Sequence, residues 1–104
     1  MIDTQLEKEF LDFVMNDVRI LKEKYDYNPS FFLKMISQYG AVDTAKRLIH
    51  SSKPSEGYTK LWEIKALKYS VENQIQDKRW KDIFTDDERE KAKKRLSDYG
   101  FQIE

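Results

Sequence analysis

The chain contains no cysteine, only two prolines and three glycines, and no long run of apolar residues. Without cysteine it cannot form disulfides, thiolate metal sites or cysteine nucleophiles. No apolar segment approaches the ~20 residues that a membrane span requires. The acidic start, "MIDTQLEKEF", lacks the basic residues and apolar core of a signal peptide. We therefore expect a cytoplasmic protein with no membrane partner.

The remaining composition is that of a folded domain. A chain of 104 residues fits one domain, so we expect a single unit over residues 1–104. Leu, Ile, Val and Phe make up a quarter of the chain, above the ~20% level that indicates disorder. The net charge is zero, but residues 29–70 carry +4 against −3 in residues 1–28. This basic middle segment could attract an anionic partner, although a solvated surface is the favoured explanation.

The first 25 residues have the periodicity of one long helix. Apolar residues recur at steps of three and four, and neither glycine nor proline interrupts them. The stripe is wide enough to pack against more than one neighbour. Its main members are Ile2, Leu6, Phe10, Phe13, Val14, Val18, Leu21 and Tyr25.

Helix-start and helix-end signals then divide the middle of the chain. Asn28 and Pro29 are typical of a helix N-terminus, with Asn28 as the N-cap, and Gly40 is typical of a helix end. Residues 41–50 resume helical spacing and finish at His50, where a basic side chain suits the helix dipole. Pro54 prevents that helix from continuing.

The stretch "SSKPSEGYTKLWEIKALKYSVE" (51–72) is the most distinctive part of the sequence. Tyr58, Leu61 and Trp62 predict a short amphipathic helix whose Trp62 enters the core, and Ser70 is the expected N-cap of the next helix. The stretch is therefore interpreted as a corner of a helical fold. The functional question it raises is whether Glu63 and nearby lysines line a groove there.

The end of the chain contains a complete capping box. Thr85 would cap the last helix while Glu88 reaches back from its third position, and Gly100 would end it. Phe101 and Ile103 are then expected to fold back onto the core. Because no segment shows sustained strand alternation, we predict an all-α fold, a compact bundle or array of five to six helices.

Signatures of catalysis, metal binding and cofactor binding are missing from this pattern. His50 is the single histidine, and the adjacent Ser51 and Ser52 would not face it on a helix. The glycines share no phosphate-binding motif. The acids of "TDDERE" lack the spacing of a calcium loop and are explained by helix capping. We therefore assign no catalytic, cofactor or metal residues.

Several motifs from about Gly40 to Phe101 resemble a widespread, uncharacterised bacterial domain. They are "GAVDTAKRLI", "PSEGYTKLWE", "SVENQI" and "RWKDIFTDDEREKAKKRLSDYGF". The resemblance covers roughly 60 residues and departs from the family pattern at "IKALKYSVE". It implies a helical bacterial module, sometimes attached to other domains, and implies no reaction.

Three hypotheses about function follow. The leading one is a non-enzymatic accessory module that binds another protein, or a second copy of itself. The alternative is a nucleic-acid-associated module that uses the central basic segment (Lys46, Arg47, Lys53, Lys60) or the last helix. The third is an enzyme with Glu63, His50 or Glu72 as acid or base. The candidate partner-binding groove consists of Lys46, Arg47, Lys60, Trp62 and Glu63.

Overall fold

The computed structural model describes residues 4–103, and every regular element in this range is helical. The all-α prediction is confirmed, as is the long first helix of 21 residues. The α-helices are α1 (Thr4–Lys24), α2 (Ser30–His50), α3 (Glu56–Glu63), α4 (Val71–Gln74) and α5 (Asp86–Asp98). Two 3₁₀ turns, η1 (Leu67–Tyr69) and η2 (Lys78–Trp80), precede and follow α4.

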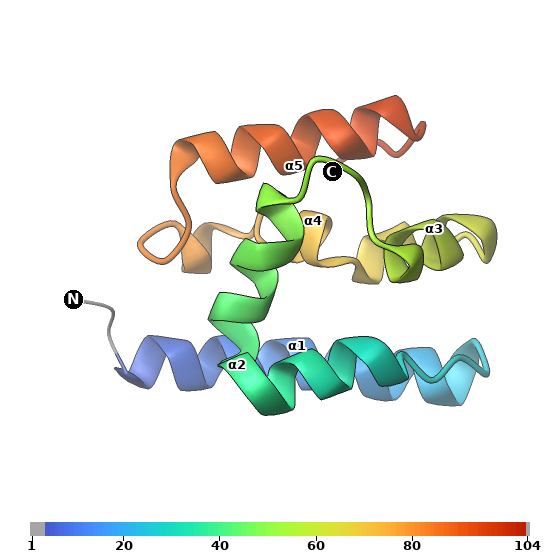
Figure 1. The fold of residues 1–104 in the computed structure, drawn as a ribbon, viewed down its shortest axis with the longest axis horizontal. Coiled ribbons are helices and arrows are strands. Elements are labelled where there is room, and N and C mark those ends of the chain that lie inside the picture. The colour runs from blue at the N-terminus through green and yellow to red at the C-terminus, as the bar shows by residue number, and fades with distance from the viewer. Residues whose placement is uncertain (1–3, 104) are drawn as a thin grey trace.

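The helices form three levels (Figure 1). The first half of α2 packs beside α1 at one end of the molecule, and α5 lies at the opposite end. The short elements α3, η1 and α4 lie between these levels. The second half of α2 crosses from the level of α1 to that of α5, so it contacts both α4 and α5.

Gly40 causes the change of direction within α2. Its φ of 82° and ψ of 166° interrupt the helical conformation and lie in a region that is accessible essentially to glycine alone. The predicted helix end at Gly40 and the restart after it are therefore confirmed. The predicted Asn28 cap is wrong, because the N-cap position is Pro29 and no side chain caps this terminus. Asn28 lies one residue too early to reach the free amides.

The main core lies where α1, the second half of α2, α4 and α5 meet. Phe10 of α1 is fully buried and meets Trp80 and Phe84 edge to face, with ring centroids 5.3 and 5.2 Å apart. Such aromatic pairs add ~0.5–1.5 kcal/mol beyond burial alone. Ala45 and Ile49 of α2 complete the contact from the other side.

A second, smaller core joins the end of α1 to α3, η1 and the end of α5. Tyr58, Leu61, Leu67 and Leu96 are buried there together with Leu21. The final residues, Phe101 and Ile103, pack against this cluster as predicted. The two cores fix α3 and α4 in place and leave the first half of α2 attached mainly to α1.

Two predicted helix caps are confirmed. The Ser70 hydroxyl accepts a hydrogen bond from the amide of Asn73, 3.2 Å away. Thr85 and Glu88 form the full capping box of α5, with distances of 3.1 and 2.9 Å. Each such cap contributes ~1 kcal/mol to stability.

Trp62 is not in the core, contrary to the prediction. Its side chain is 47% exposed, because Tyr58 and Leu61 already fill the space beneath the two turns of α3. Phe31 is also outside, with 73% of its surface exposed. Within residues 4–103, none of the helices has the length and apolar character required for a membrane span.

Candidate functional site

An apolar groove of about 770 Å³ opens between the first half of α2 and the α3–η1–α4 segment. Its volume lies in the range typical of ligand pockets. The groove exists because Gly40 directs the first half of α2 along α1 and away from α3. The apolar walls are contributed by Val18, Leu21, Phe32, Met35, Leu48, Leu61 and Val71.

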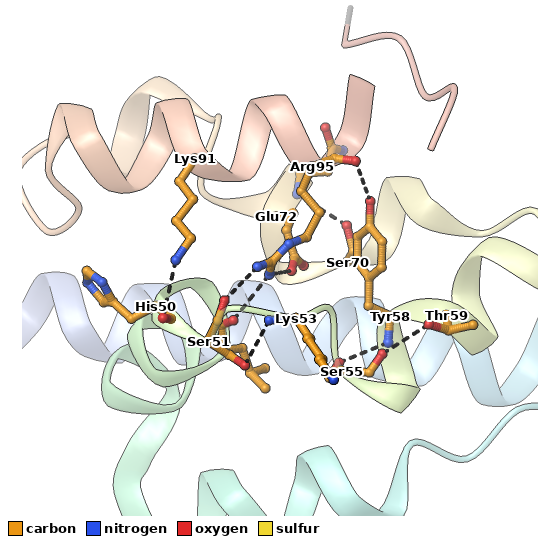
Figure 2. A network of polar contacts seen from close by, with 12 residues as sticks. His50, Ser51, Lys53, Ser55, Tyr58, Thr59, Ser70, Glu72, Lys91 and Arg95 are labelled. Carbon is orange, nitrogen blue, oxygen red and sulfur yellow. Dashed lines mark hydrogen bonds and ion pairs between the residues drawn. The ribbon is translucent and has the colours of Figure 1, made fainter. Parts of the chain in front are cut away.

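Figure 2 shows a buried ion pair between Glu72, which lines the groove, and Arg95 of α5. Glu72, at the start of α4, accepts a hydrogen bond on Oε2 from Nη1 of Arg95, 3.0 Å away. Glu72 is 3% exposed and Arg95 is 8% exposed. Arg95 also donates to the carbonyls of Leu48 (3.2 Å) and Ser51 (2.8 Å), at the carboxyl end of α2. One guanidinium therefore fastens α5 to both α2 and α4.

Burial dominates the electrostatics of Glu72. Removal from water raises the pKa of this carboxyl, and the hydrogen bond and charge of Arg95 offset only part of that increase. The nearby Tyr58 hydroxyl donates to the carbonyl of Arg95, 3.2 Å away, and burial also raises its pKa. The polar groups here are thus held in fixed positions by the core.

Gln74 adds a second buried polar group to the lining. Its Nε2 donates to the carboxylate of Asp17 on α1, 3.0 Å away, and burial raises the pKa of Asp17. Because a carboxylate can only accept, this contact fixes the orientation of the amide. The other atom, Oε1, is buried and has no hydrogen-bond partner in the described structure.

The mouth of the groove combines a charged helix face with an exposed aromatic ring. Glu56, Lys60 and Glu63 occur at steps of four and three on α3, so they share one face. All three line the groove, and none has an ion-pair partner among residues 4–103. Phe31, on α2, lines the groove as well.

The five residues predicted to form one groove do not lie together. Lys60 and Glu63 border the groove described above. Trp62 lines a separate hollow, where it meets Tyr99 edge to face at 5.5 Å; Glu63 borders this hollow too. Lys46 and Arg47 border neither hollow.

Both of those basic side chains are occupied elsewhere. Lys46 contacts Glu88 on α5 at 2.8 Å. Arg47 pairs with Asp43 at 3.2 Å and stacks on the ring of Tyr39. Two of the seven basic side chains of residues 29–70 are therefore already paired with carboxylates.

Glu88 is the second buried carboxylate. Burial acts to raise its pKa, but hydrogen bonds from Lys46, the Thr85 amide and His50 together lower it below the usual value. Nε2 of His50 lies 2.7 Å from this carboxylate, and the imidazole remains largely exposed. His50, at the end of α2, therefore has a carboxylate partner on α5, which the sequence did not predict.

The proposed acid–base residues are only partly brought together. Glu63 and Glu72 both border the groove, whereas His50 is not among its lining residues. Glu72 is held by Arg95, and His50 is held by Glu88. Among residues 4–103, no group of three His, Cys, Asp or Glu side chains is arranged to hold a metal ion. The geometry is that of an apolar binding surface with a few fixed polar groups.

Sequence reasoning missed Arg95 and Gln74 as parts of this site. Arg95 lies in the basic run "KAKKRL" (91–96) of the last helix, but it follows Ala92 by three residues and precedes Tyr99 by four. This spacing places it on the apolar face of α5 and could have indicated burial. Gln74 has no comparable signal, because its burial depends on contact with α1.

Comparisons with known proteins identify no relative. No protein-family model matches the chain, and no curated protein or solved structure matches it. The resemblance to a bacterial helical domain therefore remains a prediction.

Proposed function

We propose that this chain is a non-enzymatic interaction module that binds an amphipathic helix of another protein in the groove between α2 and α3. The observation that carries the proposal is an apolar groove of about 770 Å³ bordered by the exposed ring of Phe31. Binding of an amphipathic helix in an apolar groove is a common mode of peptide recognition. Following the sequence-based expectations, we place this activity in the cytoplasm of a bacterium.

Exposed aromatics favour a protein over a small ligand as the occupant. Phe31 and Trp62 are both substantially exposed, and they border neighbouring hollows that share Glu63. A small molecule inside the groove would leave the ring of Trp62, which lines the neighbouring hollow, in water. A partner helix, with a diameter of ~10–12 Å including side chains, would cover the mouth and the adjacent rings.

The charges at the mouth indicate which helix would fit. Glu56 and Glu63 outnumber Lys60 on the exposed face of α3, and the deeper Glu72 is already balanced by Arg95. The net charge of the mouth is therefore negative. We expect an occupant with apolar residues at steps of three and four, flanked by more basic than acidic side chains.

The nucleic-acid alternative has less support. Lys46, Arg47 and Lys94 each pair with a carboxylate of the same chain, and Arg95 is buried. Phosphate binding would have to replace these contacts, whereas a typical nucleic-acid surface presents clustered, free basic groups.

The proposal is tested with a displayed library of helical peptides of about five turns. The library varies two sets of peptide positions: the apolar positions at steps of three and four, called the seam, and the charged positions that flank them. The full chain is the target. We expect selected peptides to be basic, and Phe31→Ala to weaken their binding about tenfold, equivalent to 1.4 kcal/mol. Met15→Ala is the matched control, because Met15 is an exposed apolar residue that does not line the groove.

A charge reversal tests the second element of the proposal. Glu63→Lys should weaken the binding of basic peptides and reduce the salt dependence of that binding. Glu90→Lys, an exposed reversal on α5, should leave both unchanged. The groove would be rejected as a helix-binding site if no peptide were selected. It would also be rejected if each groove variant weakened peptide binding no more than its matched control. A concentration-dependent dimer lost in Phe31→Ala would instead identify a second copy as the occupant.

A further inference from the structure

We infer that the groove selects an occupant that inserts a neutral hydrogen-bond donor, a hydroxyl or a carboxamide N–H, among its apolar side chains. This inference rests on the proposed function and specifies the chemistry that the groove recognises. Its basis is the inventory of donors and acceptors on the two buried α4 residues that line the groove, Glu72 and Gln74.

The donors around these residues are already committed. The Tyr58 hydroxyl donates to the Arg95 carbonyl, and the Ser70 hydroxyl donates to the Leu67 carbonyl at 2.7 Å. Gln74 Nε2 donates to Asp17. Around Glu72 and Gln74, therefore, the polar groups that can still take a partner are acceptors.

Two acceptors are available. Gln74 is 3% exposed, and its buried Oε1 has no hydrogen-bond partner among residues 4–103, which is unfavourable for a desolvated acceptor. Glu72 receives Arg95 on Oε2, which leaves acceptor capacity on Oε1. Because Oε1 of Gln74 is buried, the Gln74 side chain must turn toward the groove to meet a donor that enters with the occupant; that hydrogen bond would then offset part of the cost of burial.

The donor should be neutral. Arg95 already compensates the charge of Glu72, so a Lys or Arg side chain brought to this depth would be an excess buried cation. The desolvation of such a cation is strongly unfavourable, because Glu72, the buried carboxylate that lines the groove, is already balanced by Arg95. A Ser, Thr, Asn or Gln side chain supplies a donor without that penalty. Basic residues of the occupant then remain at the mouth, near Glu56 and Glu63.

The test combines changes on both sides of the interface. The peptide library is selected on the full chain, and the seam positions are sequenced. We expect one seam position to be enriched in Thr, Ser, Asn or Gln. Replacing that residue by an apolar one of similar shape, such as Thr by Val, should weaken binding to the parent about tenfold. The same peptide change should alter binding to Gln74→Met less than about twofold, as a double-mutant cycle requires.

Gln76→Met is the matched control. Gln76 lies two residues after Gln74. Its side-chain amide donates to the carbonyls of Glu72 and Arg89, and it does not line the groove. The peptide change should retain its full effect in this variant, and circular dichroism verifies that both variants fold. Entirely apolar seams, or an equal effect of the peptide change in the parent and in Gln74→Met, would overturn the inference and leave helix binding intact. If no peptide binds at all, both the inference and the proposed function fail.

Discussion

Replacement of Arg95 by Met should be among the most damaging single changes in this protein. Arg95→Met preserves an apolar stem of similar length but removes every charged donor. Glu72 then remains buried as an uncompensated carboxylate, which costs ~3–5 kcal/mol. The Leu48 and Ser51 carbonyls also lose their donor. A domain of this size has ~5–15 kcal/mol of stability in total, so the variant should lose about a fifth of it or more.

Removal of Glu72 should lower the stability less than removal of Arg95. In Glu72→Met, Arg95 loses its carboxylate but still donates to two carbonyls at the end of α2. We expect a loss of about 2 kcal/mol, because a charge with remaining hydrogen bonds is less penalised than one with none. In the double variant neither charge of this pair is left, and the cost should fall to about 1–2 kcal/mol for the uncapped carbonyls.

The assay is urea unfolding followed by circular dichroism, with all four proteins measured in one buffer. The double variant should be more stable than Arg95→Met alone, which corresponds to a coupling of about 2 kcal/mol or more. Additive losses from the two single variants would show that Glu72 and Arg95 do not act as a pair. A loss below about 1 kcal/mol in Arg95→Met would refute the uncompensated-charge argument itself.

The pH dependence gives an independent check on that argument. Without Arg95, burial should raise the pKa of Glu72 further above its unfolded value. A raised folded pKa means that stability is fully present below the unfolded pKa and is lost as pH rises through the folded pKa. The deficit of Arg95→Met relative to the parent should therefore shrink in acid. A deficit that is constant from neutral pH into acid would contradict this cause.

Local signals in the sequence were sufficient to predict most of the fold. The caps at Ser70 and Thr85 depend on bonds to residues three positions away, and the break at Gly40 depends on its own backbone. Such features are encoded within one helical turn. The Trp62 error has a different origin, because periodicity shows which face of α3 is apolar but not how much of that face the core covers.

The site could be predicted only in part for the same reason. Lys60 and Glu63 were placed at the corner from their position in the sequence, and they do border the groove. The Glu72–Arg95 pair joins residues 23 positions apart, and charge pattern does not show which of the 38 charged side chains are buried. The groove itself depends on the direction that α2 takes before Gly40, a long-range property.

The remaining predictions concern the bend in α2 and the second buried carboxylate. Gly40→Ala should lower the stability measured by urea unfolding by about 1–3 kcal/mol, because alanine rarely adopts this backbone conformation. Gly57→Ala is the control: this glycine has no positive φ, so its replacement should be neutral or slightly stabilising. Glu88→Gln should cost about 1–2 kcal/mol at neutral pH, since it removes a charge that accepts three hydrogen bonds. Because the folded pKa of Glu88 is lowered, its stabilisation is present above the unfolded pKa and is lost as pH falls through the folded pKa. The parent and the variant should therefore converge in acid, whereas the exposed control Glu90→Gln should differ little from the parent at any pH. If the Glu88→Gln deficit persisted unchanged in acid, its cause would be altered packing of the capping box and not the charge of the carboxylate.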